Sequence, residues 1–134
     1  MRIFSLFSIL IWTCILSYGQ NLVGYNGKEI QKYMMENNRD FNFEKVANSR
    51  FKYLKYSDSS DSQTLLFFIS NDSICRSVRL ICELSIKAEK VKEFNSIYKK
   101  SSENRWIDNR DGKDYLIEIR DEKWSCIITI EPDK

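Results

Sequence analysis

The 134-residue sequence contains no histidine, and this absence excludes several kinds of chemistry. Ser-His-Asp and Cys-His catalysis both need an imidazole to accept the proton of the nucleophile, so neither is available. Histidine zinc sites are excluded as well, and no C-x-x-C pair among the scattered cysteines replaces them. Any catalysis would depend on carboxylates, Lys, Tyr or Ser. We therefore predict no catalytic motif, no metal site and no cofactor.

Proline and glycine are scarce, and neither charge sign dominates. One Pro and four Gly argue against a flexible linker or a low-complexity tail, and no internal repeat is present. The 21 Lys and Arg residues nearly balance the 19 Asp and Glu residues, which gives no electrostatic attraction to nucleic acid or to an anionic membrane. We expect a single domain, and neither nucleic acid nor membrane among its partners.

The first nineteen residues differ from the rest of the chain. Met1 and Arg2 provide a positive start, residues 3–15 carry no charge and are mostly apolar, and Ser17-Tyr18-Gly19 places small residues around a cleavage site before Gln20. This pattern is typical of a secretory signal peptide. A retained membrane anchor is the alternative, but the apolar stretch is shorter than the roughly 20 residues that cross a bilayer. We predict a signal peptide at 1–19, a domain at 20–134 and a secreted or periplasmic protein.

Removal of the leader would leave three cysteines, Cys75, Cys82 and Cys126. An oxidising compartment favours a disulfide, and an odd count leaves one thiol over. Cys75 and Cys82 lie seven residues apart in one predicted strand, roughly 23 Å when extended, whereas a bridge needs Cα atoms within about 7 Å. We therefore predict a Cys82–Cys126 disulfide. The alternative is that all three are small buried thiols with no bond.

Hydrophobic periodicity predicts an α+β domain, an antiparallel sheet of about five to six strands with two helices packed on one face. The expected order is α-β-β-β-α-β-β-β, with residues 41–46 ambiguous. The predicted helices cover 28–37 and 86–100, and the predicted strands cover 51–56, 64–69, 74–84, 105–108, 115–120 and 124–130.

This order of elements, with a polar turn before Thr64–Phe68, resembles the fold of type III secretion chaperones and of related bacterial sensory regulators. The segments Lys90–Asn95, Trp106–Asp108 and Gly112–Tyr115 are similar to the helix and hairpin pattern of that group. The end of the leader, Ser17–Gln20, resembles those of small exported proteins of unknown function from Bacteroidetes. The resemblance implies a non-enzymatic binding module, often dimeric, and brings no catalytic residues with it.

Two charged segments admit a functional interpretation. Residues 108–112 resemble part of a calcium loop, but Ile107 would occupy the first ligand position, and a hairpin turn explains the same residues. The second predicted helix carries five lysines, Lys87, Lys90, Lys92, Lys99 and Lys100. Because Glu89 and Glu93 alternate with them, we interpret this face as solvated rather than as a nucleic-acid site.

Three aromatic residues gather near the predicted C-terminal hairpin, namely Trp106, Tyr115 and Trp124. Exposed aromatics would form a binding platform for protein or peptide, whereas core packing is the commoner fate of aromatics in strands. We predict a non-catalytic binding module with these three residues as its candidate surface, and a homodimer through a sheet edge remains open. The alternative function is a small hydrolase of an envelope or extracellular polymer that uses paired carboxylates among Asp108, Asp111, Asp114 and Glu118.

Overall fold

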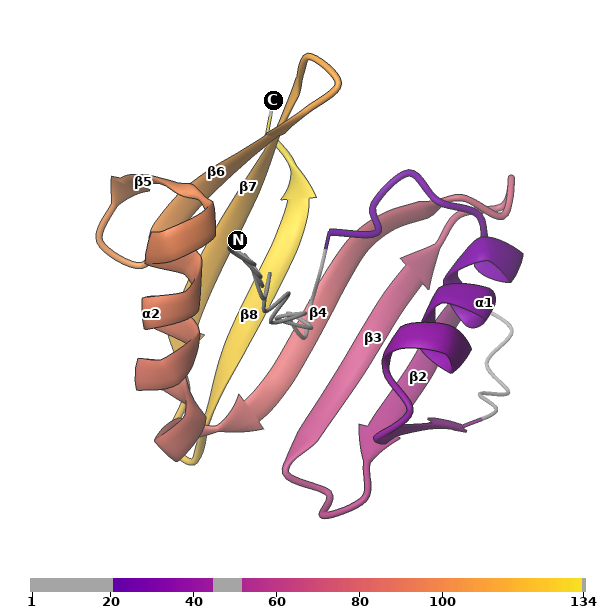
Figure 1. Ribbon diagram of the computed structural model, residues 1–134, viewed down its shortest axis with the longest axis horizontal. Coiled ribbons are helices and arrows are strands. Elements are labelled where there is room, and N and C mark those ends of the chain that lie inside the picture. The colour runs from indigo at the N-terminus through magenta and orange to yellow at the C-terminus, as the bar shows by residue number, and fades with distance from the viewer. Residues whose placement is uncertain (1–20, 45–51, 134) are drawn as a thin grey trace, which may run out of the picture.

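The computed structural model describes residues 21–44 and 52–133, which form one eight-stranded antiparallel sheet and two α-helices (Figure 1). The predicted signal peptide at 1–19 lies outside the described residues. The elements in chain order are α1 (Gly27–Asn37), β1 (Phe41–Glu44), β2 (Lys52–Asp58), β3 (Gln63–Ile69), β4 (Cys75–Glu83), the 3-10 turn η1 (Leu84–Ile86), α2 (Lys87–Ile97), β5 (Lys99–Ser102), β6 (Arg105–Arg110), β7 (Lys113–Asp121) and β8 (Ser125–Pro132).

The prediction of five to six strands was wrong, although the α+β arrangement holds. The additional strands are the two edges of the sheet, β1 and β5, each four residues long. Residues 99 and 100, which the sequence pattern places in the second helix, belong instead to β5. That helix ends at Ile97 because Tyr98 is extended, with φ −120° and ψ 160°, and Lys99 then pairs with Ile107 of β6.

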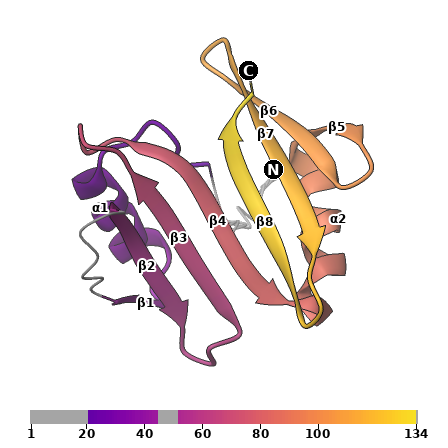
Figure 2. The ribbon, with the colours of Figure 1, turned by 180° about the vertical axis from the view of Figure 1, so that it is seen from behind.

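The sheet consists of two halves joined at its centre. Its strand order is β1-β2-β3-β4-β8-β7-β6-β5, so neighbours along the chain pair within each half. Helix α2 carries the chain from β4 to the far edge at β5, and the chain returns to place β8 beside β4. Both helices lie on one face of the sheet, one over each half, and the opposite face carries no helix (Figures 1 and 2).

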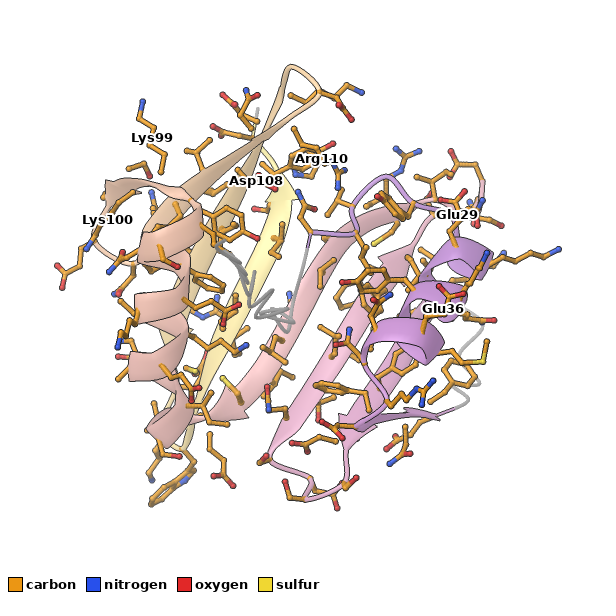
Figure 3. All side chains as sticks on the ribbon, viewed as in Figure 1. Glu29, Glu36, Lys99, Lys100, Asp108 and Arg110 are labelled. Carbon is orange, nitrogen blue, oxygen red and sulfur yellow. The ribbon has the colours of Figure 1, made fainter. Side chains whose placement is uncertain are left out.

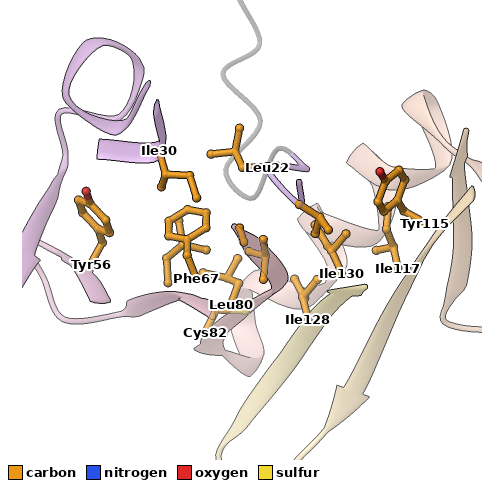
Figure 4. Close-up of a cluster of buried hydrophobic side chains, with 14 of the residues drawn as sticks. Leu22, Ile30, Tyr56, Phe67, Leu80, Cys82, Tyr115, Ile117, Ile128 and Ile130 are labelled. Carbon is orange, nitrogen blue, oxygen red and sulfur yellow. The ribbon is translucent and has the colours of Figure 1, made fainter. Parts of the chain in front are cut away.

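The helix-covered face of the sheet holds the hydrophobic core. Alternate residues of β3, β4, β7 and β8 point to this face, as the two-residue period of a strand requires. Phe67, Leu80, Ile117, Ile128 and Ile130 are among its buried side chains (Figure 4). Helix α1 adds Ile30 and Met34, and its first turn is capped by Asn26, whose Oδ1 accepts a hydrogen bond from the Glu29 amide at 2.8 Å.

Residues 21–26 cross the core between the two helices and are held from both halves of the sheet. Leu22 and Val23 are buried there (Figure 4). From β6, the Arg110 guanidinium donates hydrogen bonds to the carbonyl oxygens of Asn21, at 2.6 Å, and of Val23. From β4, the carbonyl of Cys75 accepts from the Gly24 amide at 2.8 Å. Within residues 21–44 and 52–133, no helix is long and apolar enough to cross a membrane.

Candidate functional site

The structure does not bring the three predicted aromatics together on one surface. Trp106 is fully buried, its ring centroid 5.3 Å from that of Phe94 and its Nε1 donating to Asn95 Oδ1 at 2.9 Å. Tyr115 is also buried, and its hydroxyl accepts a hydrogen bond from Arg110 at 3.2 Å. Trp124, at the turn between β7 and β8, is 79% exposed. Trp106 and Tyr115 are therefore core residues, and Trp124 stands alone on the surface.

The predicted carboxylates lie along the β6–β7 hairpin, where most of them already have partners. Asp108 accepts a hydrogen bond from Asn21, Asp114 accepts one from Asn109, and Glu118 forms an ion pair with Arg105 at 2.8 Å. Asp111 and Gly112 have φ of 52° and 77°, the left-handed backbone of a two-residue hairpin turn. Within the described part of the chain, no group of three or more His, Cys, Asp or Glu side chains could hold a metal ion.

Two of the three cysteines among the described residues lie side by side in the core. The register of β4 and β8 places Cys82 opposite Cys126, with their Sγ atoms 2.8 Å apart, and both are present as buried thiols. Burial and the neighbouring thiol raise the pKa of Cys82 to about 12. Cys75 lies elsewhere on β4, donates to the Ser77 carbonyl at 3.3 Å, and has a pKa raised by burial to about 12. Thiols with such pKa values are poor nucleophiles at neutral pH, which indicates a structural role.

One lysine of the predicted basic face points into the protein instead of the solvent. Lys90 of α2 is only 3% exposed, and its Nζ lies 3.5 Å from Glu93 Oε2. Burial lowers the pKa of Lys90, and the charge of Glu93 opposes that change. Lys99 and Lys100 lie on edge strand β5, not on α2, and project outward from it (Figure 3). The five lysines therefore do not form one helical face.

A concave site lies between α1 and the strands β1 and β2, of which β1 is the edge of the sheet. An apolar pocket of about 580 Å³ is lined by Gln31, Met34, Met35, Arg39, Phe41, Asn42, Phe43 and Tyr56. Met35 is 71% exposed and Phe43 is 50% exposed, while the Phe43 ring rests against that of Tyr56 with centroids 5.3 Å apart. The volume and the apolar lining are those of a ligand pocket. We call this site the apolar pocket.

A second pocket continues along the same side of α1 toward its N-terminus. It has a volume of about 630 Å³, and its lining includes Lys28, Gln31, Lys52, Leu54, Ile69 and Asp72. Gln31 lines both pockets, and Lys28, Gln31 and Met35 recur at the three- and four-residue spacing that places side chains on one side of a helix. We call the two pockets together the α1 groove.

The α1 groove carries positive charge. Its cations are Lys28, Lys52 and Arg39, all exposed. Asp72 is the one carboxylate among the side chains that line the two pockets, and its charge is neutralised by Arg76 at 2.7 Å. An anionic group entering the groove would therefore meet cations at either end.

Sequence reasoning missed this site. Ile30, Tyr33 and Met34 recur at three- and four-residue spacing and form the apolar stripe of α1, and Met35 lies about 100° around the helix from Met34. The sequence signal that could have indicated the site was Met35, a large apolar residue outside the apolar stripe of its helix. The other wall of the groove comes from β1, which the sequence left ambiguous.

Comparison with models of known protein families finds no match to this chain, and comparisons with curated proteins and with solved structures find none either.

Proposed function

We propose that this protein is a small exported, non-catalytic module that binds a peptide segment of another protein in the α1 groove. The observation that carries the proposal is the apolar pocket, where Met35 and Phe43 expose large apolar surfaces beside a concave site of about 580 Å³. Exposed apolar side chains that line a cavity are a usual mark of a binding site.

The lining of the groove indicates the chemistry of its ligand. Met35 supplies a flexible, polarisable side chain that adapts to different apolar groups. Lys28 and Lys52 at one end, and Arg39 at the other, favour acidic residues in the ligand. A peptide that combines apolar and acidic side chains meets both requirements.

The carboxyl groups at the α1 groove favour binding over acid–base hydrolysis at that groove. A general acid in a hydrolase of that type needs a raised pKa. The hydrogen bond and charge of Lys55 lower the pKa of Glu44, and a hydrogen bond from Ser70 is the main cause that lowers the pKa of Asp72. Asp72 lines the α1 groove and Glu44 lies in β1, which forms one wall of it. The lowered pKa values keep both carboxyl groups in the charged form.

The proposal includes export and a Cys82–Cys126 disulfide. The two thiols already face each other across adjacent strands at 2.8 Å, so oxidation would require little movement. Such a bond persists in an oxidising compartment and is rare in the cytosol. The facing thiols are thus consistent with the exported location that the leader predicts.

The binding proposal is tested with a phage library of random twelve-residue peptides, selected against the purified protein. Enriched peptides are then synthesised, and their affinities are measured for Met35→Lys and for the control Ile97→Lys. Ile97 is 49% exposed on α2, so the control places the same charge on the other helix. Both sites are exposed, so both variants are expected to fold.

We expect peptides rich in apolar and acidic residues, bound equally by the wild type and by Ile97→Lys. Met35→Lys should weaken binding about tenfold or more, because a charge replaces an apolar anchor in the pocket. Failure to enrich any peptide, or equal affinity of all three proteins, would contradict the proposal.

A further inference from the structure

The two edges of the sheet differ in how open they are to another strand. The β5 edge consists of Lys99, Lys100, Ser101 and Ser102, all exposed, and Lys99 and Lys100 extend from it into solvent (Figure 3). Lysines on an edge strand oppose pairing with a further strand, because their charges would have to be desolvated or brought close to the added chain. The β5 edge is therefore protected.

The β1 edge lacks this protection. Its four residues, Phe41–Glu44, include neither lysine nor proline, and their pairing within the described residues is with β2. An edge strand paired on one side leaves every second N–H and C=O group pointing outward. In β1 the amide of Phe41 already donates to the carbonyl of Asn38 at 3.1 Å, so by the two-residue period of the strand the outward N–H and C=O that remain open are those of Phe43. Such groups can hydrogen-bond an added strand, which is a recurrent way of binding an extended peptide.

The side chains of β1 connect this edge to the apolar pocket. Phe43 pairs with Tyr56 and lies with Phe41 on the helix-covered face, where both line the pocket. Glu44 points to the opposite face, where it forms an ion pair with Lys55 at 3.1 Å. A strand added to β1 would place alternate side chains beside Phe43 and Met35, and the others on the helix-free face.

Arg39 adds a charge to this arrangement. It lines the apolar pocket, is exposed, and forms no ion pair within the part of the chain that the structure describes. The only carboxylate of β1, Glu44, is turned to the other face and is already paired with Lys55. A carboxylate on an added strand, at a helix-side position near the pocket, would pair with Arg39.

We propose that the ligand of the α1 groove binds by strand addition to β1, as an extended segment of another protein. The segment pairs its backbone with β1, places an apolar side chain in the apolar pocket, and offers a carboxylate to Arg39. This inference rests on the proposed function and states how the peptide is held: backbone hydrogen bonds supply affinity, and the pocket with Arg39 selects the side chains.

Backbone N-methylation of an enriched peptide tests the strand pairing. A methyl group removes one N–H donor and leaves the side chain unchanged, so each position of the peptide is methylated singly. Strand addition predicts an alternating pattern. Methylation should reduce affinity about tenfold or more at alternate residues of the short stretch that pairs with the four residues of β1, and have little effect at the residues between and outside that stretch, because only those amides face β1.

Hydrogen exchange of the protein gives an independent measurement. With the peptide bound, the outward amide of Phe43 in β1 should exchange at least tenfold more slowly, while the amides of the β5 edge remain unchanged. A peptide whose binding needs Met35 but tolerates N-methylation at every position, with no slowing in β1, would overturn strand addition and leave the proposed function intact. A peptide indifferent to Met35→Lys would overturn both.

Discussion

Cys82 and Cys126 lie directly opposite each other in β4 and β8, with their sulfur atoms 2.8 Å apart at the junction of the two halves of the sheet. The sulfurs of a disulfide are separated by about 2.05 Å, so a small approach would close the bond. Its position matters because β4 and β8 are the pair that joins strands β1–β4 to strands β5–β8.

We predict that the exported protein contains this bond and that Cys75 remains a thiol. Intact mass spectrometry without reduction should give a mass two hydrogens below that of the reduced chain. Cys75→Ser should retain this mass difference, and Cys126→Ser should abolish it. Cys126→Ser should also lower the free energy of unfolding by up to about 4 kcal/mol, because the segment from Cys82 to Cys126 is no longer closed into a loop in the unfolded chain. Three titratable thiols in the unfolded, unreduced protein would contradict the prediction.

Stability should fall at alkaline pH, and Cys75 should account for part of the fall. Burial raises the pKa of Cys75 to about 12, against about 8.5 for an unfolded thiol. Between these values the unfolded chain has lost the proton that the folded chain keeps, so stability is fully present below about pH 8.5 and declines as the pH rises. Burial lowers the pKa of Lys90, so its contribution to the free energy of unfolding changes in the opposite direction. That contribution rises with pH until the pH reaches the pKa of an unfolded lysine.

The measurement is the melting temperature of the wild type and of Cys75→Ala at pH values from 7 to 10.5. The two curves should run parallel below about pH 8 and converge above it, because the variant lacks the ionisation that destabilises the folded wild type. Curves that stay parallel over the whole range would show that Cys75 does not contribute.

Arg110 should be far more important for stability than a typical surface arginine. It donates to the carbonyls of Asn21 and Val23, and its guanidinium lies over the Tyr115 ring at 4.7 Å. Arg110→Ala leaves these carbonyls without their donor, which should cost about 2–3 kcal/mol in urea denaturation. Arg76→Ala removes an exposed pair with Asp72 and should cost less than about 1 kcal/mol. Equal losses would contradict the role assigned to Arg110.

Replacement by alanine should lower the stability of the protein strongly at Trp106 and hardly at all at Trp124. Trp106→Ala removes a fully buried ring and the hydrogen bond to Asn95, and should lower the free energy of unfolding by about 3–5 kcal/mol. Trp124→Ala changes a side chain that is 79% exposed and should have an effect within about 0.5 kcal/mol. Urea denaturation of the two variants measures the difference.

Most of the secondary structure could be predicted because its cause is local. The apolar spacing predicts α1, a run of apolar β-forming residues predicts β3, alternation predicts β4, and the hairpin pattern predicts β7 and β8. The predicted bounds of these elements agree with the structure to within two residues. The edge strands could not be predicted. β5 is exposed at all four positions, so it has no alternation, and only its pairing with β6 makes it a strand.

The candidate site depended still more on the tertiary fold. The sequence shows Met35 as an apolar residue outside the core stripe of its helix, but not the strands that face it. It likewise shows Trp106 and Trp124 as two tryptophans near one hairpin, although one is packed beneath α2 against Phe94 and the other lies in the turn. Whether an aromatic residue is buried depends on which element covers it, and the residues next to it in the sequence do not show which element that is.

The sequence by itself determined the absence of histidine chemistry, the α+β class and the helix and strands whose hydrophobic period is local. The tertiary structure alone decided the eight-stranded order, the facing of Cys82 and Cys126, and the groove between α1 and β1–β2. The physical reason is that periodicity reports on which face of an element is buried, whereas strand order, register and cavities arise from contacts between segments far apart in the chain.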